Sequence, residues 1–151
     1  IIASGGVTYL LEKFPLYSGA FPVKLAGEYL NNPGAPAHNE GYSAKLTFGK
    51  SGKKRLWELN YELRELQRDA IYEEFPESDF NAFTQTPLTT GGVGGYVNGT
   101  NVRGHVFKFG YSATDSLTFF LTYWLTENIR ENPPGSDSSA GRLQVDAVWK
   151  F

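Results

Sequence analysis

Side chains that could carry out chemistry are few in this chain of 151 residues, and they are scattered along it. The sequence has two histidines, His38 and His105, and no cysteine. His38 falls in a stretch rich in Pro and Gly, and His105 falls at the start of a predicted strand. Two separate histidines are too few for a metal site, and no Ser/His/acid constellation can be assembled from them. We therefore expect no catalytic residue, no cofactor and no enzyme activity.

Two further segments have compositions that could bind a ligand. An acidic cluster of Glu73, Glu74, Glu77 and Asp79 offers the carboxylate oxygens that hard cations such as Ca²⁺ prefer. A solvated surface loop explains these four residues more simply, so we expect no metal site and keep Ca²⁺ as the alternative. The glycine-rich residues 91–95 lack the Lys-Ser/Thr pair of a phosphate-binding loop, and this run predicts a connection instead.

The elements that carry these residues are predicted to be β-strands, because apolar and polar residues alternate with a period of two. In the last strand, Leu143, Val145 and Ala147 share one face, opposite Gln144 and Asp146. Residues 55–70 also fit a helical stripe with spacings of three and four, but the alternation of their neighbours favours a strand. The predicted strands are residues 5–14, 21–31, 41–49, 55–70, 102–111, 117–125 and 142–151.

The predicted connections alternate between short and long along the chain. Short ones fall at residues 14–20, 50–54 and 113–116, whereas long ones rich in Gly, Pro and Asn fall at residues 31–40, 71–101 and 131–141. Outer-membrane barrels have short turns on one side and long loops on the other, and their strands are about ten residues long. The sequence therefore predicts an all-β fold, an antiparallel transmembrane β-barrel.

Residue types on the two faces fit a barrel with a hydrated lumen. The polar face carries Thr, Ser, Gly and Asn with sparse charges, and aromatic residues fall near strand ends, as in an interfacial girdle. Girdle candidates are Trp57, Tyr111, Trp149 and Phe151 on one side and Tyr29 and Tyr61 on the other. A mild anion preference follows from the predicted lumen-facing residues, which are Lys24, Glu28, Lys45, Glu58, Glu62, Arg64, Arg103, Lys108, Arg142, Asp146 and Lys150.

The strand count indicates an incomplete barrel. Bacterial barrels of one chain have an even number of strands, at least eight, whereas about seven are predicted here. Either a strand is hidden in residues 71–101 or residues 1–151 are the C-terminal part of a larger barrel. The absence of a starting Met and of a signal peptide favours the second interpretation. The net charge of −2 argues against a nucleic-acid partner.

Several stretches resemble a family of inferred porins of Gram-negative outer membranes, aligned to its C-terminal portion. They are Phe14-Pro15-Leu16-Tyr17 to Leu30-Asn31-Asn32-Pro33-Gly34-Ala35, Tyr72-Glu73-Glu74-Phe75 to Ser78-Asp79-Phe80, and Thr100-Asn101-Val102-Arg103-Gly104 to Thr122-Tyr123-Trp124-Leu125. The resemblance implies an outer-membrane location and a barrel with roughly twice this many strands, through which small solutes diffuse. Trp149 and the terminal Phe151 look like the signal that barrel-assembly machinery recognises.

We expect an outer-membrane porin that allows passive diffusion of small hydrophilic solutes. Its expected partners are outer-membrane lipid and the barrel-assembly machinery, and a homo-oligomer or a protein bound in the lumen stays open. One alternative is a structural or sheath barrel that encloses a partner such as a redox conduit. Another is a soluble lipocalin-like barrel that binds a ligand with its aromatic face.

Overall fold

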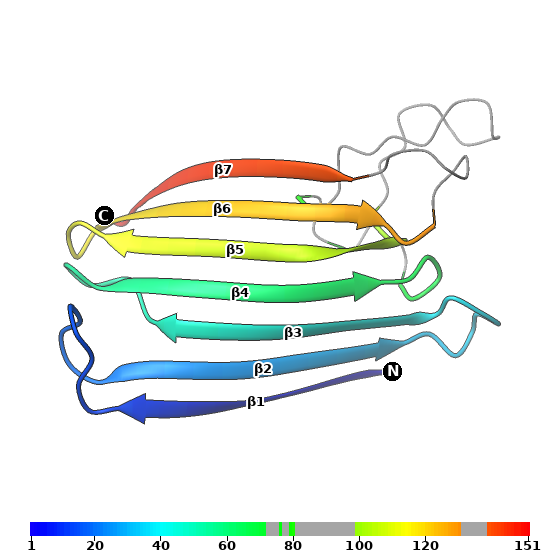
Figure 1. Ribbon diagram of the computed structural model, residues 1–151, viewed down its shortest axis with the longest axis horizontal. Coiled ribbons are helices and arrows are strands. Elements are labelled where there is room, and N and C mark those ends of the chain that lie inside the picture. Colours follow the sequence, from blue (N-terminus) through cyan, green and yellow to red (C-terminus); the bar gives the residue numbers. More distant parts are fainter. Residues whose placement is uncertain (72–75, 77–78, 81–98, 131–138) are drawn as a thin grey trace.

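The computed structural model describes residues 1–71, 76, 79–80, 99–130 and 139–151, and seven strands make up its regular structure (Figure 1). No helix in these residues is long and apolar enough to cross a membrane. The strands are β1 (Ile2–Leu11), β2 (Phe21–Asn31), β3 (Glu40–Gly49), β4 (Trp57–Leu66), β5 (Val102–Ser112), β6 (Leu117–Asn128) and β7 (Ala140–Trp149).

All seven strands belong to one antiparallel sheet in the order β1-β2-β3-β4-β5-β6-β7. Each strand pairs with its neighbours in the chain, so the sheet is a simple meander. Within the described residues β1 and β7 each pair on one side only, and the sheet is not closed. In the part of the chain that the structure describes, the predictions of an all-β antiparallel fold and of about seven strands are confirmed. Most of residues 71–101, where the sequence left room for a hidden strand, lie outside the described residues.

The segment that fits both helix and strand patterns forms β4. Its backbone pairs with β3 on one side and with β5 on the other, which satisfies its donors and acceptors within the sheet. The first strand runs from Ile2 to Leu11, three residues earlier than predicted. Its shift has a local cause, because Phe14 and Tyr17 of the following connection fold back to pack on Phe21.

The connections alternate between the two ends of the sheet, and the two longest lie at the same end (Figure 1). The predicted segregation by length is confirmed only in part, because residues 12–20 form a longer connection than residues 32–39 at the other end. Residues 12–20, 50–56 and 113–116 join the strands at the short-connection end, and residues 32–39, 67–101 and 129–139 join them at the long-connection end. Gly49 starts one short connection with a φ of 72°, and a Cβ atom there would overlap the Trp57 carbonyl oxygen. Only glycine fits this turn without displacing the backbone.

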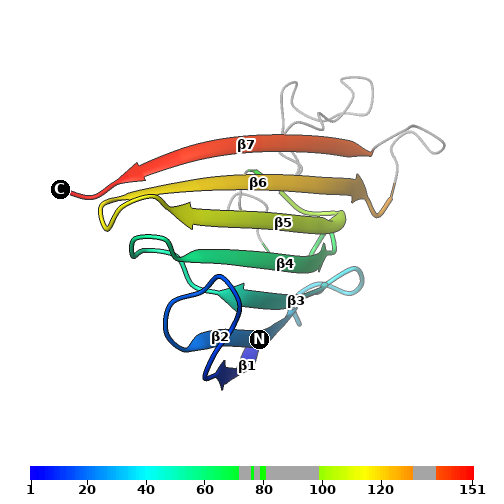
Figure 2. The ribbon, with the colours of Figure 1, turned by 60° about the vertical axis from the view of Figure 1, so that its left-hand side comes forward.

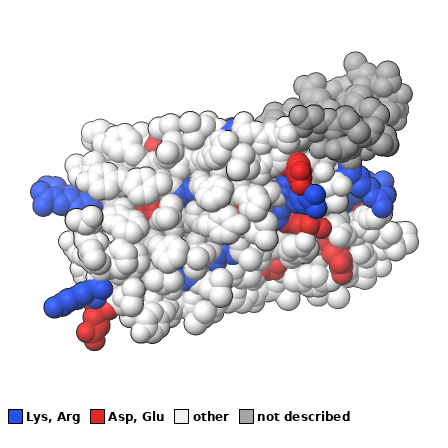
Figure 3. All heavy atoms as spheres, in the orientation of Figure 1, with Lys and Arg blue, Asp and Glu red and all other residues white. Residues whose placement is uncertain are grey.

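The sheet has two chemically different faces. We call one the apolar face; it carries Val7, Leu25, Leu46, Leu59, Phe107, Phe109, Leu121, Tyr123, Leu143 and Val145, which the strand register places together. The opposite, polar face carries Lys24, Lys45, Asn60, Glu62, Lys108, Thr122 and Gln144. Viewed over the apolar face, the molecule is mainly free of charge between the strand ends (Figure 3).

Burial on these faces is the reverse of that in a water-soluble sheet. Along β6, Thr118, Thr122 and Thr126 are buried, whereas Phe119 and Leu121 on the apolar face are exposed. The sheet is twisted and curved, since β1 and β2 are foreshortened in the view in which β6 and β7 run at full length (Figure 2). Side chains on the polar face converge and shelter one another, as they do on the inside of a curved sheet.

Candidate functional site: the polar face of the sheet

Most of the predicted lumen-facing residues share the polar face. Strand register places nine of them there: Lys24, Glu28, Lys45, Glu58, Glu62, Arg64, Lys108, Arg142 and Asp146. Lys150 lies just past the end of β7, where its backbone N–H donates to Ser116. Most of the charged residues that the sequence pattern grouped together therefore share one face of the sheet.

Arg103 lies on the apolar face, which corrects its prediction. Five residues separate it from Lys108, and an odd separation puts two strand residues on opposite faces. Register pairs Arg103 with Glu65 and with Glu127, and its Nε donates to the Glu127 carboxylate at 2.6 Å. Without Arg103, the strands give the polar face five basic and four acidic residues from the predicted set, which weakens the expected anion preference.

Several charged residues of the polar face have ion-pair or hydrogen-bond partners nearby. Glu62 is the centre of one group, with Arg64 Nη2 at 2.7 Å and Lys45 Nζ at 3.7 Å. Glu58 accepts from the backbone N–H and the hydroxyl of Ser51, both at 2.9 Å. On β7, Gln144 donates to Asp146 and accepts from Arg142. Such a face offers alternating partners to water and small polar solutes and no concentrated field of one sign.

An open groove of about 560 Å³ runs along this face over β1 to β4. Small residues from two neighbouring strands, such as Gly6 and Ala26, form part of its floor, and Glu28, Lys45 and Glu62 supply charged side chains. This floor leaves room above it because glycine and alanine project little. The groove is wide enough for water and small solutes.

Two residues of the β4–β5 connection lie against the polar face, and the sequence pattern did not predict this. Phe80 is 2% exposed and packs with Val102 and Trp124, while the Arg64 guanidinium lies 4.9 Å from the centre of its ring. Next to it, the Asp79 carboxylate accepts from Arg142 Nη1 at 2.7 Å. These contacts attach the connection to strands β4, β5, β6 and β7.

The acidic cluster is only partly visible in this arrangement. Glu73, Glu74 and Glu77 lie outside the described residues, as do the glycine-rich residues 91–95. Asp79 is described, and its partner is the Arg142 guanidinium. Within the described part of the chain, no group of three or more carboxylate or imidazole side chains could hold a metal ion.

A row of polar contacts crosses the apolar face near the long-connection end. Hydroxyl groups of Tyr29 and Tyr42 donate to Glu40 and Glu65, each at 2.7 Å. Nearer the middle of the sheet, where Tyr61 pairs with Leu46 and Phe107, its hydroxyl is 2.9 Å from Nδ1 of His105. Sequence reasoning identified Tyr29 as a girdle candidate but missed its acidic partner Glu40, because the pair depends on strand register. Tyr61 lies in the middle of β4, which corrects its assignment to a girdle at the strand ends.

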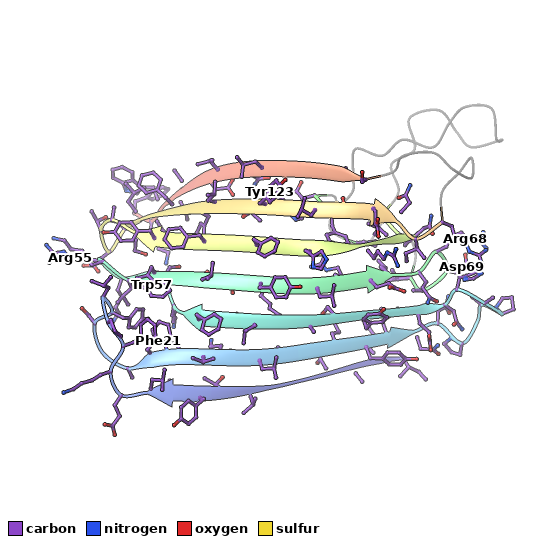
Figure 4. The ribbon with its side chains drawn as sticks, viewed as in Figure 1. Phe21, Arg55, Trp57, Arg68, Asp69 and Tyr123 are labelled. Atoms are coloured by element: carbon purple, nitrogen blue, oxygen red, sulfur yellow. The ribbon has the colours of Figure 1, made fainter. Side chains whose placement is uncertain are left out.

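Aromatic side chains gather on the apolar face at the short-connection end, where Phe21 and Trp57 lie together (Figure 4). Phe14 stacks on Phe21 with ring centres 4.0 Å apart, and Trp57 Nε1 donates to the Leu16 carbonyl at 3.1 Å. We call Phe14, Tyr17, Phe21 and Trp57 the aromatic corner. It covers a patch of the apolar face with protein, and Phe21 is fully buried there.

Tyr17 links the aromatic corner to the next short connection. Its hydroxyl donates to the Lys50 carbonyl at 3.0 Å and lies 3.1 Å from the Lys50 backbone nitrogen, which donates to it. Burial raises the pKa of this hydroxyl and the nearby Glu58 charge adds to the rise, against the hydrogen bond to the Lys50 backbone. At the other end, the hydrogen bonds to Asp69 raise the pKa of the Arg68 guanidinium further.

Trp149 ends β7 on the apolar face, opposite Leu117 of β6, and Phe151 follows as an exposed residue. Their role as an assembly signal stays a prediction. Comparisons of the chain with protein-family models, with curated proteins and with solved structures found no match.

Proposed function

We propose that this chain forms part of a transmembrane β-barrel of the bacterial outer membrane, and that its polar face lines a water-filled pore. Small hydrophilic solutes would cross this pore by passive diffusion. The observation that carries the proposal is the reversed burial of the two faces, with sheltered threonines and exposed leucine and aromatic side chains. Soluble monomers rarely expose a continuous apolar surface of this extent, whereas lipid is a suitable solvent for it.

Strand length supports the same proposal. The strands have ten to twelve residues. At a tilt of about 40° such strands reach across roughly 25–30 Å, which matches the apolar band of an outer-membrane barrel. Tyrosine-rich and tryptophan-rich ends of the apolar face fit the two interfacial girdles of such a barrel.

The open edges determine what the barrel would need. Among the described residues, β1 and β7 each have one edge without a strand partner, and lipid offers no partners to the backbone donors and acceptors there. We therefore propose that further strands pair with both edges and close the barrel. This fits the sequence expectation that residues 1–151 are part of a larger barrel.

A soluble lipocalin-like carrier fits the structure less well. In such a barrel the apolar face lines the ligand cavity, and the polar face meets water. Here Leu121 is 44% exposed and Val145 is 70% exposed, while Ser112 on the polar face is fully buried. The side that shelters its residues is therefore the polar one.

The test is to purify the protein at its full natural length in detergent and to record currents across planar bilayers. We expect stepwise conductance, and its absence would overturn the pore. Solubility without detergent would favour the lipocalin-like carrier instead. Density for another chain inside the barrel would favour a sheath around a partner protein.

A further inference from the structure

We propose that Asp79 and Phe80 determine the ion preference of the pore. Phe80 attaches its part of the β4–β5 connection to the polar face, and Asp79 compensates the positive charge of Arg142 there. This inference rests on the proposed pore function. Both residues belong to the connection between β4 and β5, yet their contacts reach as far as β7.

Phe80 attaches the β4–β5 connection to the sheet at one position. Its side chain is almost completely buried on a face whose other residues are mainly polar, and it packs on Val102 and Trp124 with Leu66 and Val106 around them. These four neighbours come from three adjacent strands, β4, β5 and β6. They form an apolar patch on the polar face, and Phe80 covers it. An apolar contact of this kind holds a connection in place independently of salt.

Asp79 then meets a cation that is itself held in position. The Arg142 guanidinium lies 5.5 Å from the centre of the Trp124 ring and also donates to Gln144 at 3.1 Å. In the Asp79–Arg142 pair, the two side chains are 33% and 35% exposed. Their charges therefore remain close enough to water to act on a passing ion, and loss of either charge would leave the other uncompensated.

A second pair of the same kind serves as a control. Arg68 and Asp69 belong to the same connection and approach to 3.0 Å, but they lie beyond the end of β4 (Figure 4), where the Asp69 backbone N–H donates to the His38 carbonyl. The Asp69 side chain is 37% exposed, close to the value for Asp79. Asp69→Asn therefore removes a matched charge from the mouth, and Asp79→Asn removes it from the polar face.

The experiment measures reversal potentials and single-channel conductance of the full-length protein in a KCl gradient. A unit charge about 6 Å from an ion in bulk-like water contributes ~0.7 kcal/mol, or roughly a threefold change in a permeability ratio. We expect Asp79→Asn to raise the anion-to-cation permeability ratio by about this factor and Asp69→Asn to leave it near the wild-type value. Exchange of the two charges, by Asp79→Arg with Arg142→Asp, should restore the wild-type ratio.

Phe80→Ala separately tests the apolar contact between the connection and the sheet. We expect a higher conductance because the connection loses its apolar contact, and Phe80→Leu should keep most of the wild-type value. If wild-type protein gives no channels, the pore function fails. If wild-type channels form but Asp79→Asn and Asp69→Asn have the same permeability ratio, the proposed pore function is retained and this inference is overturned.

Thiol cross-linking supplies a readout that does not depend on conduction. The chain has no cysteine, so an Asp79→Cys, Arg142→Cys double variant carries only the two introduced thiols. A short bifunctional thiol reagent should join them, as seen by altered gel mobility after cleavage between the two positions. The Asp69→Cys, Arg142→Cys variant is the control and should not be joined. Equal cross-linking of both variants, or of neither, would overturn the inference.

Discussion

The apolar and polar faces of the sheet are made by the same strands but shelter their residues in opposite ways. On β6, Leu121 is 44% exposed and the adjacent Thr122 is 5% exposed. In water this arrangement would be unfavourable, because the apolar side chains would be exposed to solvent while the hydroxyl groups of the threonines are buried. The difference shows that the sheltered side of the sheet is the polar one, which is the arrangement that the proposed barrel requires if the apolar face meets lipid and the polar face meets water.

Substitutions at Val145 and Gln144 test the difference between the two faces most strongly. They are consecutive residues near the middle of β7, so their side chains lie on opposite faces at nearly the same depth. We expect Val145→Arg to destabilise the protein in a bilayer by about 2–4 kcal/mol, since it places a charge at the depth of the lipid midplane. Urea unfolding in lipid vesicles measures this loss.

Gln144→Arg is the matched control, with the same new side chain on the polar face. We expect a change below about 1 kcal/mol, because Asp146 lies beside it and water reaches this face. Equal losses for the two variants would show that the faces do not meet different solvents. A soluble, unchanged Val145→Arg protein would have the same meaning.

The aromatic corner sharpens the comparison, because there the apolar face is covered by protein and not left open. Trp57→Ala removes ring contacts with Phe14, Tyr17 and Phe21 and the hydrogen bond to Leu16. We expect a loss of about 2 kcal/mol, since each aromatic pair contributes about 0.5–1.5 kcal/mol. Unfolding in detergent and in lipid should give the same loss, and Trp57→Phe should recover part of it. A loss that appears in lipid alone would contradict packing on protein.

Tyr17 gives the smallest expected effect. Tyr17→Phe removes its hydrogen bond to Lys50, and we expect a loss of about 0.5 kcal/mol at neutral pH. Because the pKa of Tyr17 is raised above its ordinary value of 10.0, the folded state favours the neutral phenol. Its contribution is therefore present below pH 10 and is lost as the pH rises through the higher folded-state value.

Melting temperatures at pH 8 and pH 11 measure this effect. The difference between wild type and Tyr17→Phe should shrink at the higher pH, where the wild-type phenol loses its proton. A difference that grows with pH would mean that the folded state favours the phenolate.

Alternation along the strands was sufficient to predict the seven strands and the sides of their connections. It also decided β4, whose leucines fit a helix as well, because a lone helix has no place between two paired strands. Arg103 could have been placed correctly from the same alternation, since its separation from Lys108 is odd.

The alternation of apolar and polar residues could not predict contacts that depend on strand register or on long connections. Tyr42 meets Glu65 only because of the β3–β4 register, which alternation alone does not fix. Asp79 meets Arg142 across 63 positions of chain, and the partner is determined by how the connection returns over the sheet. A carboxylate in a polar segment gives no local signal of such a partner.

The meander order has a consequence for how the chain assembles. Nearly every pairing joins strands that are close in sequence, and such hairpins form with little loss of chain entropy. The step from Leu66 to Val102 is the exception, because a long connection separates the two strands in the sequence and closing it costs more chain entropy. We therefore expect β1–β4 and β5–β7 to form as two local hairpin units and to join at the β4–β5 seam last, which makes that seam the slow step of folding.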